Sequence, residues 1–352
     1  MSNPLAHDLD QVLAHTEGLW DGLRGQRIFI TGGTGFFGCW LLESLAWAND
    51  RLDLRASATV LTRNPQAFMR KAPHLASHPA IHLHSGDVRS FDFPGGEYSH
   101  IIHAATEASG PSYGESPLAV LDTIVEGTRH TLEFARRCGT PTFLLTSSGA
   151  VYGKQPPRLA QIPEDYEGAP DPLDPGSTYG EGKRLAEHLC ALYAQHYGIQ
   201  PKNARCFAFT GPYLPLDTHL AIGHFIRAGL RGEPIRVKGD GATQRSYLHA
   251  ADLTIWLWTI LLKGQSCRPY NVGSDAAMTI ADLAHLVAGQ FEPRPCVEIA
   301  GNPTSALAGE RYIPSIERAR RELGLRPTIG LAEAVQRTTD WFRRRADEVK
   351  EH

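Results

Sequence analysis

Residues 29–45 read FITGGTGFFGCWLLESL and place Gly32, Gly35 and Gly38 at the spacing G-x-x-G-x-x-G. The residues before this turn are typical of a strand, and those after it have the apolar pattern of a helix. Glycines at such a turn let the backbone bend sharply and approach a pyrophosphate, whose charge the helix N-terminus stabilises. With a second strand some twenty residues on, the stretch predicts a dinucleotide-binding unit rather than a glycine-rich turn without a ligand.

Strand-like and helix-like segments alternate through the first two thirds of the chain, which predicts an α/β fold with a Rossmann-type, doubly wound parallel sheet. After about residue 206 the sequence becomes rich in Pro and Gly, which favours a smaller C-terminal α+β substrate lobe. The predicted parts are a peripheral N-terminal helix over 1–24, a dinucleotide-binding domain over 25–206 to which 246–275 return, and a substrate lobe over 207–245 and 276–345.

Composition excludes several classes of protein. The 352 residues carry a net charge of −3, so no basic field indicates nucleic acid as a partner. No segment resembles a signal peptide or a membrane span, and the six cysteines show no regular spacing, so we expect a cytoplasmic protein with reduced thiols. Four histidines, at 74, 78, 82 and 84, lack the further ligands of a metal site, and we expect no metal.

The second predicted strand bears on the choice of cofactor. Such strands usually end in an acid that holds the adenosine ribose, but this one ends in Arg63. An arginine there can pair with a 2′-phosphate, so we expect NADP(H) over NAD(H). Alternatively, Arg63 is solvated and Asn64 caps a helix that begins at Pro65. Asp87 is placed to contact the adenine edge or to cap the following turn.

Ser148 ends a predicted strand, and the helix that begins near residue 178 carries Tyr179 and Lys183 on one face. Lys183 can stabilise the Tyr179 phenolate. A shift of the tyrosine pKa from about 10 to near 7 requires roughly 4 kcal/mol, which a nearby ammonium and the positive nicotinamide ring can together supply in a dehydrated cleft. Glu181 points to another side of the helix. Together these residues predict a proton relay.

With these motifs, the sequence resembles the extended short-chain dehydrogenase/reductase family, in the branch that acts on nucleotide-activated sugars. The resemblance runs from Arg27 to Phe342 and includes TGGTGFFG, GDV, HAAT, SSGAVYG, YGEGK, RSYLHAADL, YNVGS and RARRELGLRP. It implies a nucleotide-diphosphate sugar as substrate and Ser148, Tyr179 and Lys183 as catalytic residues. It also implies a homodimer formed by helices around 116–138 and 178–197, whose apolar residues include Leu189, Leu192 and Tyr193.

Further site residues combine the motif and the resemblance. The predicted cofactor-binding residues are Gly32, Thr34, Gly35, Phe36, Phe37, Gly38, Arg63, Asp87, Val88, Ala104, Ala105, Thr106, Thr146, Tyr179, Lys183 and Phe207. The predicted substrate-binding residues are Ser148, Ala208, His224 and Arg245. By the resemblance, Phe207 lies by the nicotinamide, and Arg245 and His224 lie by the sugar diphosphate.

The chain departs from the family where dehydratases carry an acid and a base after the catalytic serine. Gly149 and Ala150 stand at these positions, and a carboxylate that decarboxylases tend to keep there is also missing. Removal of water across C5 and C6 needs both groups, whereas hydride transfer at a carbinol does not. Ala208 and Ile124 also stand where the family often has asparagines.

We therefore expect an NAD(P)-dependent nucleotide-sugar 4-epimerase that works through a 4-keto intermediate. The alternative is an NADPH-dependent reductase of nucleotide 4-keto-6-deoxysugars. A 4,6-dehydratase that recruits another base, such as Glu107, ranks behind both. A binding protein that senses the cofactor without turnover is the alternative outside the enzymes, and the intact relay argues against it.

Overall fold

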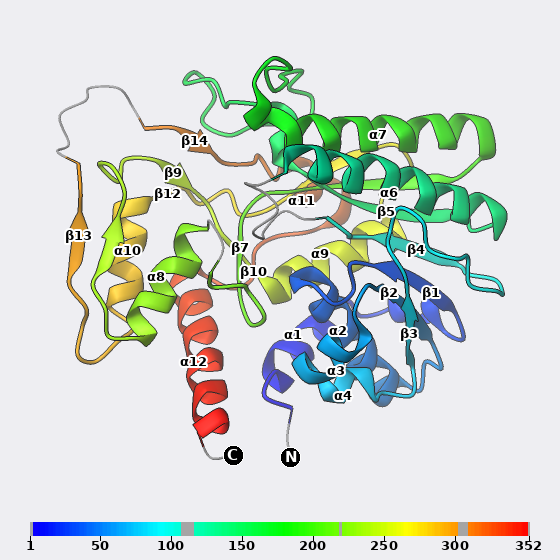
Figure 1. Cartoon of the computed structure of the whole chain (residues 1–352), viewed down its shortest axis with the longest axis horizontal. Helices are drawn as coiled ribbons and strands as arrows, with labels where there is room; N and C mark the ends of the chain where they lie inside the picture. Colours follow the sequence, from blue (N-terminus) through cyan, green and yellow to red (C-terminus); the bar gives the residue numbers. More distant parts are fainter. Residues whose placement is uncertain (1–2, 107–115, 218–219, 302–308, 351–352) are drawn as a thin grey trace.

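The computed structural model describes residues 3–106, 116–217, 220–301 and 309–350, and its centre is a seven-stranded parallel sheet (Figure 1). The strand order is β11-β6-β5-β4-β1-β2-β3. The strands are β1 (Arg27–Thr31), β2 (Ser57–Thr62), β3 (Ile81–Ser85), β4 (His100–His103), β5 (Thr142–Ser148), β6 (Gln200–Cys206) and β11 (Pro269–Val272). The predicted Rossmann-type α/β fold is confirmed, because the order 3-2-1-4-5-6 is that of a doubly wound dinucleotide-binding sheet.

The inner strands are buried because helices cover both faces of the sheet. Every residue of β1 after Arg27, and every residue of β5 after Thr142, is buried. Parallel strands in this position consist of nearly continuous apolar residues, as in Ile28, Phe29 and Ile30. The register pairs Ile28 with Ala58 on one side and with His100 on the other, so β1 lies in the middle of the sheet.

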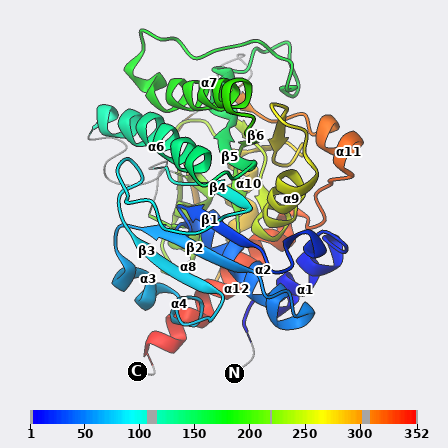
Figure 2. The same ribbon diagram turned by 90° about the vertical axis from the view of Figure 1, so that its right-hand side faces the viewer.

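Two groups of helices form the outer layers (Figure 2). One face carries α6 (Pro117–Arg137) and α7 (Thr178–Tyr197), and the other carries α1 (Ala6–His15), α2 (Phe36–Leu52) and α9 (Ala250–Lys263). The short helices α3 (Pro65–Lys71) and α4 (Pro73–Ala76) follow β2. Asn64 accepts a hydrogen bond from the Ala67 amide at 2.9 Å, and Pro65 is the first residue of α3, which confirms the predicted helix cap.

The predicted smaller lobe is present and has its own core (Figure 1). Apolar side chains of α8 (Ala221–Leu230) and α10 (Ile280–Ala288) meet there, including Phe225, Leu283 and Val287. Its strands are short: β8 (Ile235–Val237) pairs with β13 (Val297–Ile299), and β9 (Gln244–Arg245) lies between β12 (Met278–Thr279) and β14 (Arg311–Tyr312).

The remaining elements join the two parts. β7 (Phe209–Thr210) pairs with β10 (Leu248–His249), and β11 extends the main sheet beyond β6. The chain then continues through α11 (Glu317–Leu323) and α12 (Leu331–Lys350). An ion pair between Asp8 and Arg337 connects α1 to α12. The residue boundaries of the predicted domains stay a prediction.

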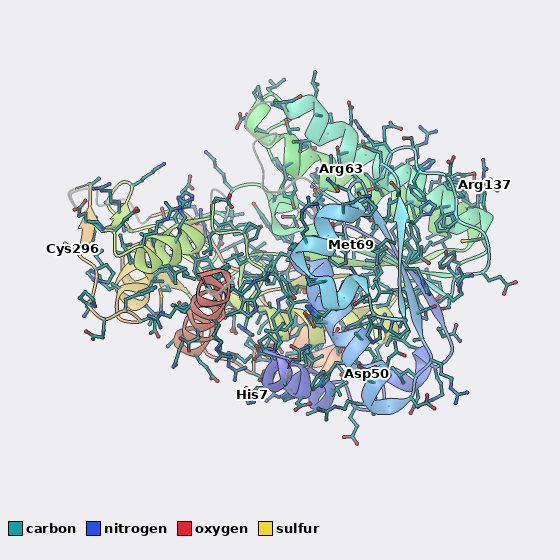
Figure 3. All side chains as sticks on the ribbon, turned by 60° about the horizontal axis from the view of Figure 1, so that its bottom comes forward. His7, Asp50, Arg63, Met69, Arg137 and Cys296 are labelled. Atoms are coloured by element: carbon teal, nitrogen blue, oxygen red, sulfur yellow. The ribbon has the colours of Figure 1, made fainter. Side chains whose placement is uncertain are left out.

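Two findings concern the predicted absence of a membrane partner and of a metal. In the ranges given above, no helix is long and apolar enough to cross a membrane. The same ranges contain no group of three or more His, Cys, Asp or Glu side chains arranged to hold a metal ion. All six cysteines are unpaired, and Cys296 lies at the far end of the smaller lobe from Arg63 (Figure 3).

Candidate active site

A cavity of about 980 Å³ opens at the carboxyl ends of the sheet strands, between the sheet and the smaller lobe. Ligands of doubly wound sheets bind at this edge, where the loops that follow the strands meet. The structure places most of the predicted site residues on its wall: Gly32, Thr34, Gly35, Phe36, Phe37, Arg63, Asp87, Val88, Ala104, Ala105, Thr106, Thr146, Ser148, Tyr179, Phe207, Ala208 and Arg245. Gly38, Lys183 and His224 are not among the lining residues.

The glycine turn leaves no room for side chains. Gly32 has a φ of +69°, and a Cβ atom on it would lie 2.4 Å from the carbonyl oxygen of Ala104. A Cβ atom on Gly38 would lie 2.3 Å from the backbone of Gly33, so α2 packs directly on the turn. The helix begins at Phe36, and its first amide groups adjoin the cavity. Amides at such a helix end suit a pyrophosphate.

The part of the cavity wall that follows β2 and β3 carries charge of both signs. Asp87 accepts hydrogen bonds from the backbone amide and the Nε of Arg89, each at 2.9 Å, and these bonds lower the pKa of Asp87 to about 2. Asp87 therefore both caps the turn and lines the cavity. Arg63 is exposed and lines the cavity. Lys71, which was not predicted, donates a hydrogen bond to the Thr34 carbonyl at 2.7 Å.

Ser148 and Tyr179 also line the cavity, and the Lys183 ammonium lies near the Tyr179 ring. Ser148 is the last residue of β5, and its Oγ accepts a hydrogen bond from the Ala150 amide at 3.1 Å. Tyr179 lies in the first turn of α7, and the Lys183 Nζ is 5.8 Å from the centroid of its ring. Lys183 is buried beneath the wall and donates to the Thr146 carbonyl at 2.8 Å. Burial lowers the pKa of Lys183 to about 8.

A partly buried ion pair joins α7 to the sheet next to these residues. Glu187 lies one turn after Lys183 and accepts two hydrogen bonds from Arg205 on β6, at 3.0 and 2.7 Å. Glu187 also accepts a hydrogen bond from Ser147 at 2.5 Å. The pair therefore connects α7, which carries Tyr179, to β6, and the Ser147 bond connects α7 to β5, which carries Ser148. The sequence motifs gave no signal for this pair, because its partners come from separate segments.

The space after Ser148 is filled by apolar and aromatic groups rather than by an acid. A Cβ atom on Gly149 would lie 2.6 Å from the Phe207 ring and 2.6 Å from the Tyr312 hydroxyl. Among the residues that the structure describes, the carboxylates on the cavity wall are Asp87 and Asp240. Glu107, the substitute base considered from the sequence, lies outside the described residues. Tyr312 also lines the cavity, although no sequence motif indicated it.

Comparison with known proteins identifies the family. A sequence model of the NAD dependent epimerase/dehydratase family matches residues 28–273. The chain belongs to this family. It is 32% identical to UDP-glucuronic acid decarboxylase 1 of Arabidopsis thaliana, over 92% of this chain and 71% of the relative. It is 30% identical to UDP-glucuronic acid decarboxylase 1 of Danio rerio, over 91% of this chain and 73% of the relative.

Solved structures show the same fold across the family. The epimerase Mth375 of Methanothermobacter thermautotrophicus superposes with a TM-score of 0.77 at 21% identity, and 99% of each chain is covered. DesIV of Streptomyces venezuelae, a dTDP-glucose 4,6-dehydratase with NAD and TYD bound, superposes with a TM-score of 0.75 at 24% identity, covering 92% of this chain and 98% of its own.

The cavity fits the nicotinamide dinucleotide on which this family depends. The glycine turn and the start of α2 would hold the pyrophosphate, because any side chain at Gly32 would collide with the backbone there. Thr106 lines the cavity, and its buried hydroxyl has no hydrogen-bond partner among the residues that the structure describes, which suits a hydrogen bond to a ligand. Lys183 and Tyr179 would adjoin the nicotinamide end. The individual residue assignments stay predictions.

As a member of the epimerase/dehydratase family, the chain is an enzyme. A bound nicotinamide dinucleotide would accept and donate the hydride, and the residues of the site can then handle the proton. Tyr179 can exchange a proton with a hydroxyl, while the ammonium of Lys183 favours the phenolate. Ser148 can hydrogen bond to the same oxygen. The site thus supports oxidation and reduction of a carbinol carbon.

Proposed function

We propose that this enzyme is an NAD(P)-dependent nucleotide-sugar 4-epimerase. One observation carries the proposal: Ser148 and Tyr179 line the cavity above Lys183, while Gly149 is closed off by Phe207 and Tyr312. This arrangement supports hydride transfer at C4 and lacks, in the described part of the wall near Ser148, the carboxylates that elimination of water needs. The sequence relatives, named for a UDP-sugar substrate, support a nucleotide sugar as the substrate class.

In the proposed reaction each residue has a separate role. A nicotinamide dinucleotide, when bound, supplies the hydride acceptor and donor. Tyr179 takes the proton of the C4 hydroxyl, and Lys183 holds the positive charge that stabilises its phenolate. Ser148 hydrogen bonds to the C4 oxygen during both halves of the reaction. The 4-keto sugar then rotates in the cavity and presents its opposite face. Tyr179 returns the proton, and the configuration at C4 is inverted.

A second candidate is an NADPH-dependent reductase of nucleotide 4-keto-6-deoxysugars. Arg63 at the cavity rim favours it, because a guanidinium there suits the 2′-phosphate of NADPH. The reductase would run only the second half of the epimerase reaction. Replacement of Arg63 by alanine tests the cofactor choice: we expect NADPH affinity to fall about tenfold, as for loss of one charge-assisted contact, and NADH affinity to hold. Equal changes for both cofactors would contradict this preference.

A product screen tests the proposed function. The purified enzyme would be incubated with UDP-, dTDP-, CDP- and GDP-sugars, and products would be resolved by NMR. We expect C4 inversion without net consumption of cofactor. Stoichiometric oxidation of deuterated NADPH, with deuterium in the sugar, would establish the reductase instead. Release of carbon dioxide from UDP-glucuronic acid would replace the proposal by a decarboxylase, the activity named in the relatives.

We also propose a homodimer formed by α6 and α7. Leu118, Leu185, Leu192 and Tyr197 are exposed on these helices. Predicted Leu189 and Tyr193 instead pack partly against the core beneath them. Exposed apolar side chains on neighbouring helices support association with a second copy. Light scattering is expected to give twice the chain mass of 38.6 kDa, and a monomer would refute the dimer. A cytoplasmic location stays a prediction.

A further inference from the structure

Tyr213 lies where the chain passes from the core of the sheet to the core of the smaller lobe. Its side chain belongs to the sheet core, whereas Leu214 belongs to the lobe core. Its φ of +69° is in the left-handed region. Of the residues that the structure describes, the other non-glycine residues with positive φ are Asp53, Arg55 and Cys267, and all three are exposed. Building on the proposed function, we infer that Tyr213 is a positioning residue that fastens the start of the lobe to the helix behind the glycine turn, and so holds the lobe in place across the cavity from the sheet.

The segment around Tyr213 is bound to α2 at two places. The Tyr213 hydroxyl donates a hydrogen bond to the Glu43 Oε1 at 2.5 Å, and the Trp40 Nε1 donates to the Pro212 carbonyl at 2.8 Å. Glu43 is buried, and the Nε2 of His74 lies 2.7 Å from the same oxygen. Burial and the neighbouring Glu43 raise the pKa of Tyr213 well above its usual value, so the hydroxyl keeps the proton that it donates. Because a buried polar group is costly without a partner, this bond opposes separation of the two segments.

The ring of Tyr213 has further contacts with two other elements. It packs on Trp341 of α12 with a centroid distance of 5.0 Å. The Nζ of Lys71, on α3, lies 5.8 Å from the ring centroid. The same ammonium donates to the Thr34 carbonyl in the glycine turn at 2.7 Å. The phenol is therefore held between α2, α12 and the lysine that contacts the glycine turn.

The backbone conformation of Tyr213 agrees with this role. A residue with a Cβ atom rarely adopts a φ of +69°, whereas glycine adopts it freely. Such conformations persist where the surrounding structure holds them, and they cluster at functional sites. The Leu214 amide donates to the Gly211 carbonyl at 3.2 Å, which closes the turn and leads the chain into the lobe. A glycine would therefore suit the turn, and the tyrosine is there for the contacts of its side chain.

The segment that follows Tyr213 forms part of the cavity wall. Leu214, Pro215 and Leu220 line the cavity, and both leucines pack in the lobe core. Tyr213 and Glu43 are not among the lining residues. Loss of the bond between them therefore reaches a bound ligand through the position of this wall. Because the wall segment belongs to the lobe, we expect the effect on the nucleotide sugar and not on the dinucleotide at the glycine turn.

Tyr213→Phe tests the inference, because it removes the hydroxyl and keeps the ring. We expect KM for the nucleotide sugar that the product screen identifies to rise about tenfold, as for loss of one hydrogen bond to a charged group. The dissociation constant of the dinucleotide, followed by nicotinamide fluorescence, is expected to be unchanged. Tyr98→Phe is the matched control, because Tyr98 is buried, its hydroxyl donates to Thr59 at 3.1 Å, and it does not line the cavity. We expect the control to keep both constants.

The same substitution in a second background shows whether Glu43 is the partner that matters. In Glu43→Leu, the acceptor is already lost, so Tyr213→Phe is expected to change KM by less than about twofold. A tenfold rise of KM in both backgrounds would overturn the inference. An unchanged KM in Tyr213→Phe would also overturn it.

A distance measurement tests the attachment without turnover. Cys267 precedes β11 of the sheet, Cys296 precedes β13 of the lobe, and both are exposed. Spin labels on these two thiols, in a Cys138→Ala background that removes a partly exposed third thiol, would report the distance between sheet and lobe. We expect a broader distribution of distances in Tyr213→Phe than in the wild type, and an unchanged one in Tyr98→Phe. Equal widths in all three proteins would refute the inference. If the wild type converts no nucleotide sugar but the distribution broadens, the proposed function fails while the role of Tyr213 stands.

Discussion

The two walls of the cavity are built in different ways. On the sheet wall, the glycine turn, Ser148 and Tyr179 follow the ends of long parallel strands or begin long helices. On the lobe wall, Arg245 and Tyr312 stand on strands of two residues that pair only with one another and with β12. Regular elements make the sheet wall recognisable from local sequence, whereas the lobe wall depends on which short segments come together.

This difference predicts separate roles for the two walls, which experiments can test. If the sheet wall carries the chemistry, substitutions there should lower kcat or abolish cofactor binding. If the lobe wall holds the substrate, substitutions there should act mainly on KM.

The largest effect is expected for Tyr179→Phe on the sheet wall. Loss of the group that exchanges the proton should lower kcat/KM about 10³-fold, within the range for a general acid or base. Cofactor affinity, followed by nicotinamide fluorescence, is expected to stay within twofold. Tyr197→Phe serves as the control on the same helix, because Tyr197 is exposed near its end. Normal turnover in the Tyr179→Phe enzyme would show that the sheet wall does not carry the chemistry.

The glycine turn should tolerate no side chain. In Gly38→Ala the new Cβ atom would lie 2.3 Å from the Gly33 backbone, which cannot move aside as a side chain can. We expect a loss of about 3 kcal/mol in the free energy of unfolding, as for severe overpacking, and loss of cofactor binding. Gly95→Ala is the matched control, since its Cβ atom would meet no atom within 4 Å. Denaturant titration of both variants would show whether they differ.

Lys183 should make stability depend on pH. Burial lowers its folded pKa to about 8 from an ordinary value of 10.5, so between these values the unfolded chain binds more protons. Stability then rises with pH in this window, and is lower below pH 8, where the buried group is charged. Between pH 7.5 and 9.5, the free energy of unfolding of the wild type should rise by about 2 kcal/mol relative to that of Lys183→Met. If the free energy of unfolding varied with pH in the same way for both proteins, the lowered pKa of Lys183 would be contradicted. Lys263→Met, on the surface, is expected to follow the wild type.

The lobe wall should give the smallest effect. Arg245→Ala is expected to raise KM for the nucleotide sugar about tenfold, which corresponds to about 1.4 kcal/mol, with cofactor affinity unchanged. Arg236→Ala is the control in the same lobe, because Arg236 is an exposed residue paired with Glu298 at 2.9 Å. A fall in kcat/KM that comes entirely from kcat would contradict the division between the two walls.

Much of the site could be predicted from local patterns, and the exceptions share a cause. The cap at Asn64 and the position of Ser148 at a strand end follow from a few neighbouring residues. Lys71 and Tyr312 could not be found in this way, because their partners Thr34 and Phe207 lie in distant segments. The segment around Arg311 and Tyr312 has no periodic pattern, so its sequence indicates neither a strand nor a site.

The sequence by itself determined the family, the sheet with its glycine turn, and the helix face shared by Tyr179 and Lys183. Strand ends and the helical repeat place such residues through short-range geometry. Only the tertiary structure decided what stands beside Ser148. The space above Gly149 is filled by a phenol from a distant strand, and packing between non-local segments depends on shape and pairing that no local pattern of residues contains.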